Sequence, residues 1–146
     1  LGAEKNTLSE KLQQRISDYT QQGGNLMLSG SYLGSILPTH LAQNTLKFTH
    51  GGSMYGVTTG QVFGANTTLS FPTQVNEKSY AVPAPDCLLP TAGAYSTFVY
   101  TPGNYGAGIA YKGTDFRTFV LGFPFESIDN AQHRSRIMKA ALDLFK

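Results

Sequence analysis

The chain has 146 residues, a length that fits one domain with a core of its own. The formal net charge is only +2 and the basic residues are scattered, which argues against nucleic acid or an anionic membrane as partner. Cys87 is the single cysteine, so no disulfide forms within the chain, and no apolar run is long enough to span a bilayer. We therefore expect no nucleic-acid partner and no membrane insertion.

Charged residues make up 14% of the chain, against roughly 25% in an average soluble protein. The shortage lies between Phe48 and Tyr111, where only Glu77, Lys78 and Asp86 are charged. Glycine, threonine, serine, asparagine and tyrosine fill this stretch, a composition usual in exported β-rich proteins. The sequence also begins without Met. We expect a fragment of a larger protein that is secreted or held at the cell surface, in the periplasm or outside the cell.

The N-terminal part predicts a helix followed by a buried strand. Thr7 and Glu10 form a capping box, and apolar residues recur after it at helical spacing: Leu8, Leu12, Ile16 and Tyr19. Gly23-Gly24 ends the helix, because glycine adopts a left-handed conformation at little cost. Residues 25–29 are bounded by glycine and have apolar residues at the consecutive positions 26–28, which predicts a strand buried on both faces, as in a parallel sheet.

The middle of the chain predicts a second helix and then short strands. A turn at 30–34 leads into a helical segment that Pro38 interrupts and residues 41–46 resume. Residues 48–105 are interpreted as a β-rich insertion, because glycines separate short runs of Tyr, Val, Thr and Phe. Three prolines make residues 81–91 an extended, irregular connection.

The C-terminal part predicts a hairpin and a last helix. Residues 107–112 and 116–122 flank a Gly-Thr-Asp turn, and the second of these runs is a buried strand. A loop at 122–126 follows, and Asp129 or Asn130 caps the last helix. The apolar residues of that helix predict its buried stripe: Ile137, Met138, Ala141, Leu142 and Phe145.

This order of elements predicts an α/β fold, an open sheet with helices on its faces whose early strands are missing from the chain. Ligands of such sheets bind beyond the carboxyl ends of the strands, where the loops 30–34 and 122–126 lie. If the two strands are neighbours, Ser31, Tyr32 and Glu126 face one crevice.

Two stretches resemble class I glutamine amidotransferase-like domains. Gly30-Ser31-Tyr32-Leu33-Gly34 is similar to the nucleophile elbow of that family, and Phe123-Pro124-Phe125-Glu126-Ser127 to the run after its later strand. The family has Gly-x-Cys-x-Gly and His-Pro-Glu at these places, whereas this chain has Tyr32 for the cysteine and Phe123 or Phe125 for the histidine. The resemblance implies a flavodoxin-like fold for the single domain 1–146, without amide hydrolysis.

Four further phrases resemble the C-terminal regions of secreted bacterial proteins labelled xanthan lyase. They are Gln22-Gly23-Gly24-Asn25-Leu26, Ser29-Gly30-Ser31-Tyr32, Leu121-Gly122-Phe123-Pro124-Phe125-Glu126 and Arg136-Ile137-Met138. Polysaccharide lyases need a group that neutralises a uronate carboxylate, with a base and an acid beside it, and the sequence shows no Arg, His and Asn cluster. The resemblance implies polysaccharide and the other domains of a parent chain as partners.

The site candidates each have a plainer interpretation. Ser31 stands one position before the tip of a Gly-x-Ser-x-Gly elbow, so it fits a helix cap better than a nucleophile. Tyr32 either contacts a ligand or packs with its hydroxyl at the surface. Glu126 is either a general acid or ligand-binding group, or a structural carboxylate that accepts hydrogen bonds from loop amides. The histidines share no metal-ligand spacing, so we expect no metal and no cofactor: His40, His50 and His133.

Three tyrosines are candidates for a sugar-binding face, since sugars stack on aromatic rings: Tyr95, Tyr100 and Tyr105. Asp86 either points into the crevice or forms a turn, and Cys87 fits a small buried hydrophobe. We expect a non-catalytic accessory or ligand-binding domain linked to polysaccharide. The alternatives are a glycan-degrading enzyme, a lyase or hydrolase with Tyr32 and Glu126 in its site, and a structural module between domains.

Overall fold

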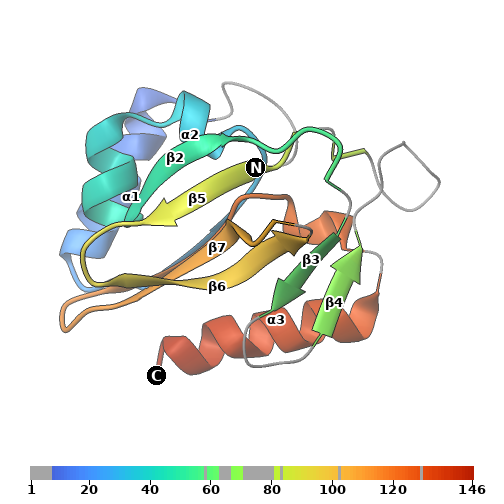
Figure 1. Cartoon of the computed structure of the whole chain (residues 1–146). Helices are drawn as coiled ribbons and strands as arrows, with labels where there is room; N and C mark the ends of the chain where they lie inside the picture. Colours follow the sequence, from blue (N-terminus) through green and yellow to red (C-terminus); the bar gives the residue numbers. More distant parts are fainter. Residues whose placement is uncertain are drawn as a thin grey trace.

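Two sheets carry the fold in the computed structural model, which describes residues 8–57, 59–62, 67–70, 81–82, 84–101, 103–128 and 130–146 (Figure 1). The main sheet has six strands in the order β1-β8-β7-β6-β3-β4, and β2 pairs with β5 in a separate ribbon. The strands are β1 (Leu26–Ser29), β2 (Phe48–Ser53), β3 (Thr59–Val62), β4 (Thr67–Ser70), β5 (Asp86–Pro90), β6 (Ala94–Thr101), β7 (Tyr105–Lys112) and β8 (Arg117–Leu121).

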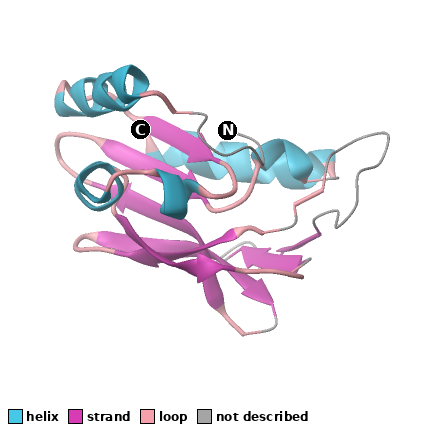
Figure 2. Cartoon of the chain, turned by 90° about the horizontal axis from the view of Figure 1, so that it is seen from above, coloured by secondary structure: helices cyan, strands magenta, loops and turns pink. Residues whose placement is uncertain are grey.

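The helices lie on both faces of the main sheet, as the sequence predicts. They are α1 (Glu10–Gln21), α2 (Leu33–Ile36), the π-helical turn η1 (Leu41–Thr45), the 3₁₀ turn η2 (Phe125–Ser127) and α3 (Ala131–Leu144). In Figure 1, α3 lies below the sheet with α1 and α2 on the other side, and in the view from above α3 runs behind the strands (Figure 2). None of the described helices combines the length and apolar character that a bilayer crossing needs.

The condition that the two buried strands are neighbours, which the sequence left open, is met. β1 runs parallel to β8, with Leu26 opposite Thr118 and Ser29 opposite Leu121. The other pairs of the main sheet are antiparallel, so the sheet is mixed. β1 is less buried than predicted, since only Leu28 of its four residues is buried. The reason is that β1 is an edge strand of the main sheet.

The β-rich character of residues 48–105 is confirmed for the described part of that stretch. β3, β4 and β6 extend the main sheet, whereas β2 and β5 form the ribbon. The predicted irregular connection 81–91 is wrong from Asp86 onward, because β5 forms there by pairing with β2. Pro83 lies outside the described residues.

Two apolar clusters hold the layers together. One fills the space between the main sheet and α3, and its largest fully buried side chains are Phe98, Tyr100 and Phe123. The other joins the opposite face of the sheet to α1, α2 and η1 around Leu33, Leu41 and other aliphatic residues. Each cluster gives the sheet one covered face, the arrangement typical of α/β domains.

The start and face of α1 differ from the prediction. Ser9 is the N-cap, and its hydroxyl accepts from the Leu12 amide at 3.3 Å. Thr7, the predicted cap, lies outside the described residues. Leu8 is buried, but Leu12 and Tyr19 are 41% and 51% exposed. The side of α1 that faces the core is the one that carries Thr20, which is buried.

The cap of α3 is confirmed, and its predicted stripe is partly wrong. The Asn130 side chain accepts from two amides of the first turn, at 2.8 and 3.2 Å, and Asp129 lies outside the described residues. Ile137 and Ala141 are buried, with Leu144 beside them. Two predicted members instead face outward, Met138 at 37% and Leu142 at 54% exposure.

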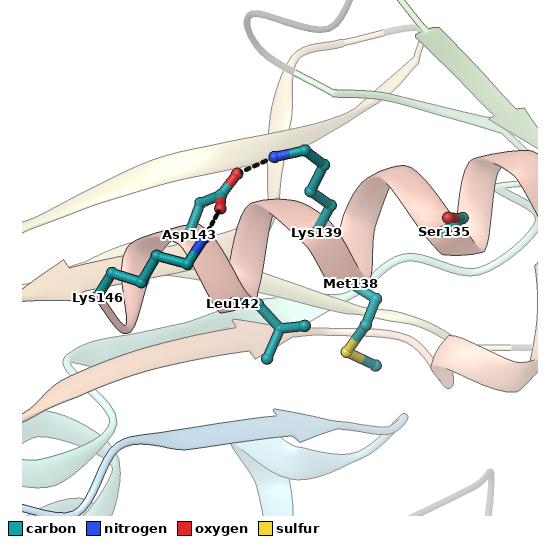
Figure 3. Close-up of a pocket in the computed structure, with 6 residues that line it drawn as sticks. All are labelled: Ser135, Met138, Lys139, Leu142, Asp143 and Lys146. Atoms are coloured by element: carbon teal, nitrogen blue, oxygen red, sulfur yellow. Dashed lines mark hydrogen bonds and ion pairs between the residues drawn. The ribbon is translucent and has the colours of Figure 1, made fainter.

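The outward pair lies in an open hollow on the surface of α3 (Figure 3). Figure 3 shows Met138 and Leu142 projecting from one side of the helix, whereas Lys139 and Asp143 project from the other, where Asp143 binds both Lys139 and Lys146. Residues of α3 and Lys146, just after its end, line this hollow, so it is open to solvent and bounded by one element.

Candidate functional site

The two loops predicted to form a crevice lie side by side. Because β1 and β8 are parallel neighbours, their carboxyl ends reach the same edge of the sheet. The Gly30 amide donates to the Leu121 carbonyl at 3.3 Å, and the Phe125 amide donates to the Ser29 hydroxyl at 3.3 Å. Ser31, Tyr32 and Glu126 therefore all belong to loops at this edge.

Tyr32 occupies the tip of the turn between β1 and α2. Its backbone is left-handed, with φ 62° and ψ 9°, and it is the N-cap of α2. A left-handed conformation costs an L-residue roughly 1–2 kcal/mol, so the surrounding structure must enforce it. A strained residue at a strand-to-helix turn is the backbone feature of a nucleophile elbow. The side chain of Tyr32 is half-buried at this tip.

Ser31 and Glu126 differ in accessibility. Ser31 is completely buried, and its hydroxyl has no hydrogen-bond partner in the described structure. It therefore does not cap α2, contrary to prediction, and it has no base within reach to serve as a nucleophile. Glu126 is exposed in the first turn of η2, which follows β8.

Asp86 forms hydrogen bonds to both loops, 30–34 and 122–126, a role that the sequence does not reveal. Its backbone amide donates to the Gly122 carbonyl at 2.7 Å, and its carboxylate Oδ2 accepts from the Gly34 amide at 3.0 Å. The Tyr100 hydroxyl donates to the Asp86 carbonyl at 2.9 Å and lies 3.3 Å from the Gly122 carbonyl. Asp86 is completely buried, so neither the crevice nor the turn interpretation describes it.

His50 lies against this carboxylate. Its Nε2 is 3.3 Å from Asp86 Oδ1, and its side chain is 27% exposed. A Cβ on Gly34 would overlap the His50 ring, so glycine at position 34 is what lets the ring approach the start of α2. The Nε2 atom is buried, so the exposed part of the ring lies on its other edges. His50 is thus a partly exposed neighbour of a buried carboxylate, packed against Gly34 in α2.

Burial sets the electrostatics of this cluster. It raises the pKa of the Asp86 carboxyl, and the Gly34 amide and His50 offset that rise only in part. Burial also raises the pKa of Tyr100 well above its usual value, so its hydroxyl stays a neutral donor. The pKa of the Cys87 thiol is raised for the same reason, which fits the predicted buried hydrophobe.

The three candidate tyrosines do not form one face. Tyr100 is completely buried, so its ring does not contact a ligand at the surface of this fold. Tyr95 and Tyr105 are 51% and 52% exposed, but Tyr95 pairs with Ala110 while Tyr105 pairs with Tyr100. They therefore stand at opposite ends of the β6–β7 hairpin, roughly 16 Å apart along the strands.

The described cluster suits hydrogen bonding and proton exchange better than covalent chemistry. The Asp86 carboxylate lies 3.3 Å from the His50 imidazole, but neither facing atom has a hydrogen-bond partner in the described structure, so the two groups are close without the orienting hydrogen bond of a general base. The residue at the tip of the turn after β1 is Tyr32, and a phenol is a weaker nucleophile than a thiol. Among the described residues, no group of three His, Cys, Asp or Glu side chains is placed to hold a metal ion.

Comparisons with known proteins concern the fold. No protein-family model and no curated protein sequence matches the chain significantly. A β-galactosidase from the Antarctic haloarchaeon Halorubrum lacusprofundi matches 99% of the chain with a TM-score of 0.64 and 17% identity. The exo-β-1,4-mannosidase Op5Man5 from Opitutaceae bacterium strain TAV5 matches 93% of it with a TM-score of 0.59 and 7% identity.

The chain is much shorter than those enzymes. It spans 21% of the β-galactosidase and 22% of the mannosidase, so the likeness concerns one part of each enzyme. The N-terminal domain of mmIFT52 also matches, over 97% of this chain and 73% of that one, with a TM-score of 0.52 and 12% identity. At these identities the shared feature is the mixed α/β fold.

Proposed function

We propose that the chain is a non-catalytic, glycan-binding accessory domain, and that it binds at the crevice formed by the loops after β1 and β8. The observation that supports this proposal is that Asp86 binds both the loop that carries Tyr32, through Gly34, and the loop that carries Glu126, through Gly122, with His50 against its carboxylate. The β-galactosidase and the mannosidase, each several times longer, contain a part with this fold, which supports an accessory role.

The chemistry of the crevice suits sugar hydroxyls. The Glu126 carboxylate accepts hydrogen bonds, the Tyr32 ring offers an apolar surface, and imidazole both donates and accepts. A hydrogen bond to a charged group contributes about 1.5–3 kcal/mol, so Glu126 is the strongest single contact in this arrangement.

A finer family assignment is part of the proposal. We propose a flavodoxin-like, amidotransferase-like domain that carries Tyr32 in place of the cysteine, supported by the left-handed backbone at that residue. The resemblance to proteins labelled xanthan lyase then favours an anionic polysaccharide such as xanthan as ligand and an exported parent protein, with its other domains as neighbours.

Calorimetric titration of the chain with oligosaccharides from xanthan and from a galactan tests the proposal. We expect saturable binding of one class, weakened about tenfold by Glu126→Gln, the equivalent of about 1.4 kcal/mol. Glu10→Gln, an exposed carboxylate on α1, is the matched control and should bind like the wild type. Absence of binding to both classes would overturn the proposal.

The His50–Asp86 contact favours a second candidate, a glycan-degrading enzyme with His50 as the base. Its test is the release of unsaturated uronate from xanthan, and of reducing sugar from galactan, by the same preparation. Product that forms with the wild type and is lost in His50→Gln would replace the accessory role with this one.

A further inference from the structure

The contact between His50 and Asp86 lies where the β2–β5 ribbon meets α2. On the ribbon, His50 stands opposite Leu88, and Asp86 is two residues from Leu88 along β5, so both side chains belong to one face of the ribbon. α2 packs on both of these strands and lies beside β2 in Figure 1. The two ionisable side chains therefore meet at the contact between the ribbon and the turn that carries Tyr32.

α2 depends on the side chain of Asp86. The carboxylate Oδ2 accepts from the Gly34 amide at 3.0 Å, and the His50 ring fills the space beside Gly34. The bond of Asp86 to Gly122 instead uses the backbone amide of Asp86, whose charge does not change with pH. α2 has only four residues, and its N-cap Tyr32 has a left-handed backbone and makes no side-chain cap bond. A change in the charge of the Asp86 carboxyl therefore acts first on α2.

The geometry makes the contact between His50 and Asp86 sensitive to charge. His50 Nε2 and Asp86 Oδ1 are 3.3 Å apart, and both atoms are buried without a hydrogen-bond partner in the described structure. A hydrogen bond requires alignment of donor and acceptor, whereas the attraction between an imidazolium and a carboxylate requires only proximity. In this position a charged ring compensates the buried carboxylate and a neutral ring does not. The His50 side chain is 27% exposed, so the ring exchanges its proton with solvent.

His50 is the charged neighbour of the Asp86 carboxyl among the described residues. Burial raises the pKa of that carboxyl, and the Gly34 amide and His50 oppose the rise. Cys87 and Tyr100 are neutral neighbours, because burial raises the pKa of both. α2 and η1 pack on β2 and contain no ionisable residue between their ends. The other ionisable residues in or beside the elements packed on the ribbon are all at least partly exposed: Tyr32, His40, Tyr95, Tyr105, Tyr111 and Lys112.

We propose that the His50–Asp86 pair is a pH-dependent switch, which holds α2 on the ribbon while the pair keeps one proton and releases it when that proton passes to solvent. With the proton on His50, two opposite charges face each other, and with the proton on Asp86, both groups are neutral. Loss of the proton leaves a buried carboxylate beside a neutral ring, and opening of the turn 30–36 lets water reach that carboxylate.

Amide hydrogen exchange of the wild-type chain, measured without ligand from about pH 5 to 8, tests the switch. We expect the protection of the Gly34 amide, relative to an unstructured peptide at the same pH, to fall about tenfold as the ring resonances of His50 titrate. The Ile109 amide, in the buried part of β7, should remain better protected throughout, because the opening is local. Constant protection of Gly34 over this range would overturn the proposal.

Two variants test the part of each group. His50→Gln leaves the proton to Asp86 alone, so the loss of Gly34 protection should move to lower pH by about one unit or more. Asp86→Asn keeps an oxygen for the Gly34 amide but carries no charge, so protection should become constant. His40→Gln removes an exposed histidine next to η1 and, as the matched control, should keep the wild-type midpoint.

A midpoint that His50→Gln leaves unchanged, or a pH dependence that survives Asp86→Asn, would overturn the switch. Weaker glycan binding at high pH would also follow from it, and that consequence rests on the proposed function. Because hydrogen exchange is measured without ligand, failure of the switch is distinguishable from failure of the glycan proposal.

Discussion

At the residue scale, Asp86 shows where reasoning from the sequence ends. Its residue type and its neighbouring prolines allow either a turn or a crevice residue. Its actual surroundings come from three distant segments, through Gly34, His50 and Gly122. No local pattern links these positions, because long-range packing alone brings them together.

The raised pKa of Asp86 predicts an unusual dependence of stability on pH. Native Asp86 keeps its proton to a higher pH than unfolded Asp86, so from about pH 4 up to its native pKa the folded state binds more protons. The free energy of unfolding contributed by this group therefore falls as the pH rises through that window. Urea denaturation across these pH values should show the deficit of Asp86→Asn relative to the wild type shrinking.

The pKa of Asp143 is shifted in the opposite direction to that of Asp86, so Asp143 serves as a control. Lys139 and Lys146 lower its pKa to about 2, so its contribution to stability is present above about pH 4 and is lost as the pH falls toward 2. The deficit of Asp143→Asn should accordingly shrink as the pH falls. A deficit of Asp86→Asn that stays constant from pH 4 upward would show that burial does not control its protonation.

Tyr32 was identified from its place between two glycines, and its left-handed backbone has a measurable consequence. Tyr32→Gly and Tyr32→Ala remove the same ring, but only glycine adopts this conformation freely, so the glycine variant should be the more stable by about 1 kcal/mol. At Ser35, inside α2, the order should reverse by a similar amount. Urea denaturation measures both differences, and an alanine advantage at position 32 would contradict the observed turn.

At the scale of elements, the sequence predicts what local chemistry determines. The Asn130 cap, the glycine stop near residue 23 and the presence of strands β1 and β8 follow from residue type and spacing, whereas their parallel pairing is known only from the structure. The bulge at Thr97 and the ribbon of β2 with β5 do not, because each depends on which strand lies opposite.

The orientation of α3 is a case in which composition misleads. Ile137 and Met138 are adjacent and both apolar, so the sequence places both in the buried stripe, but only Ile137 faces the sheet. Ile137→Ala should lower the free energy of unfolding by about 2–5 kcal/mol, whereas Met138→Ala should change it by about 0.5 kcal/mol or less. Chemical denaturation of the two variants checks this, and equal losses would mean that α3 is rotated.

At the scale of the whole molecule, the mixed sheet with helices on both faces follows from the order of elements, and the comparisons with solved structures support the same architecture. The crevice was predictable as a place, since two loops follow neighbouring strands. Its chemistry was not, because His50 and Asp86 reach it from the ribbon. Because residues of both sheets contribute to the crevice, the proposed ligand binding requires the whole domain.

The measurement that tests this assignment most directly is a map of amide chemical shifts on titration with the oligosaccharide class that binds. We predict that the perturbed residues gather in the loops 30–34 and 122–126 and around His50 and Asp86. Perturbations confined to the β6–β7 hairpin near Tyr95 or Tyr105 would contradict the crevice as the site. A spectrum unchanged by every oligosaccharide would contradict glycan binding itself.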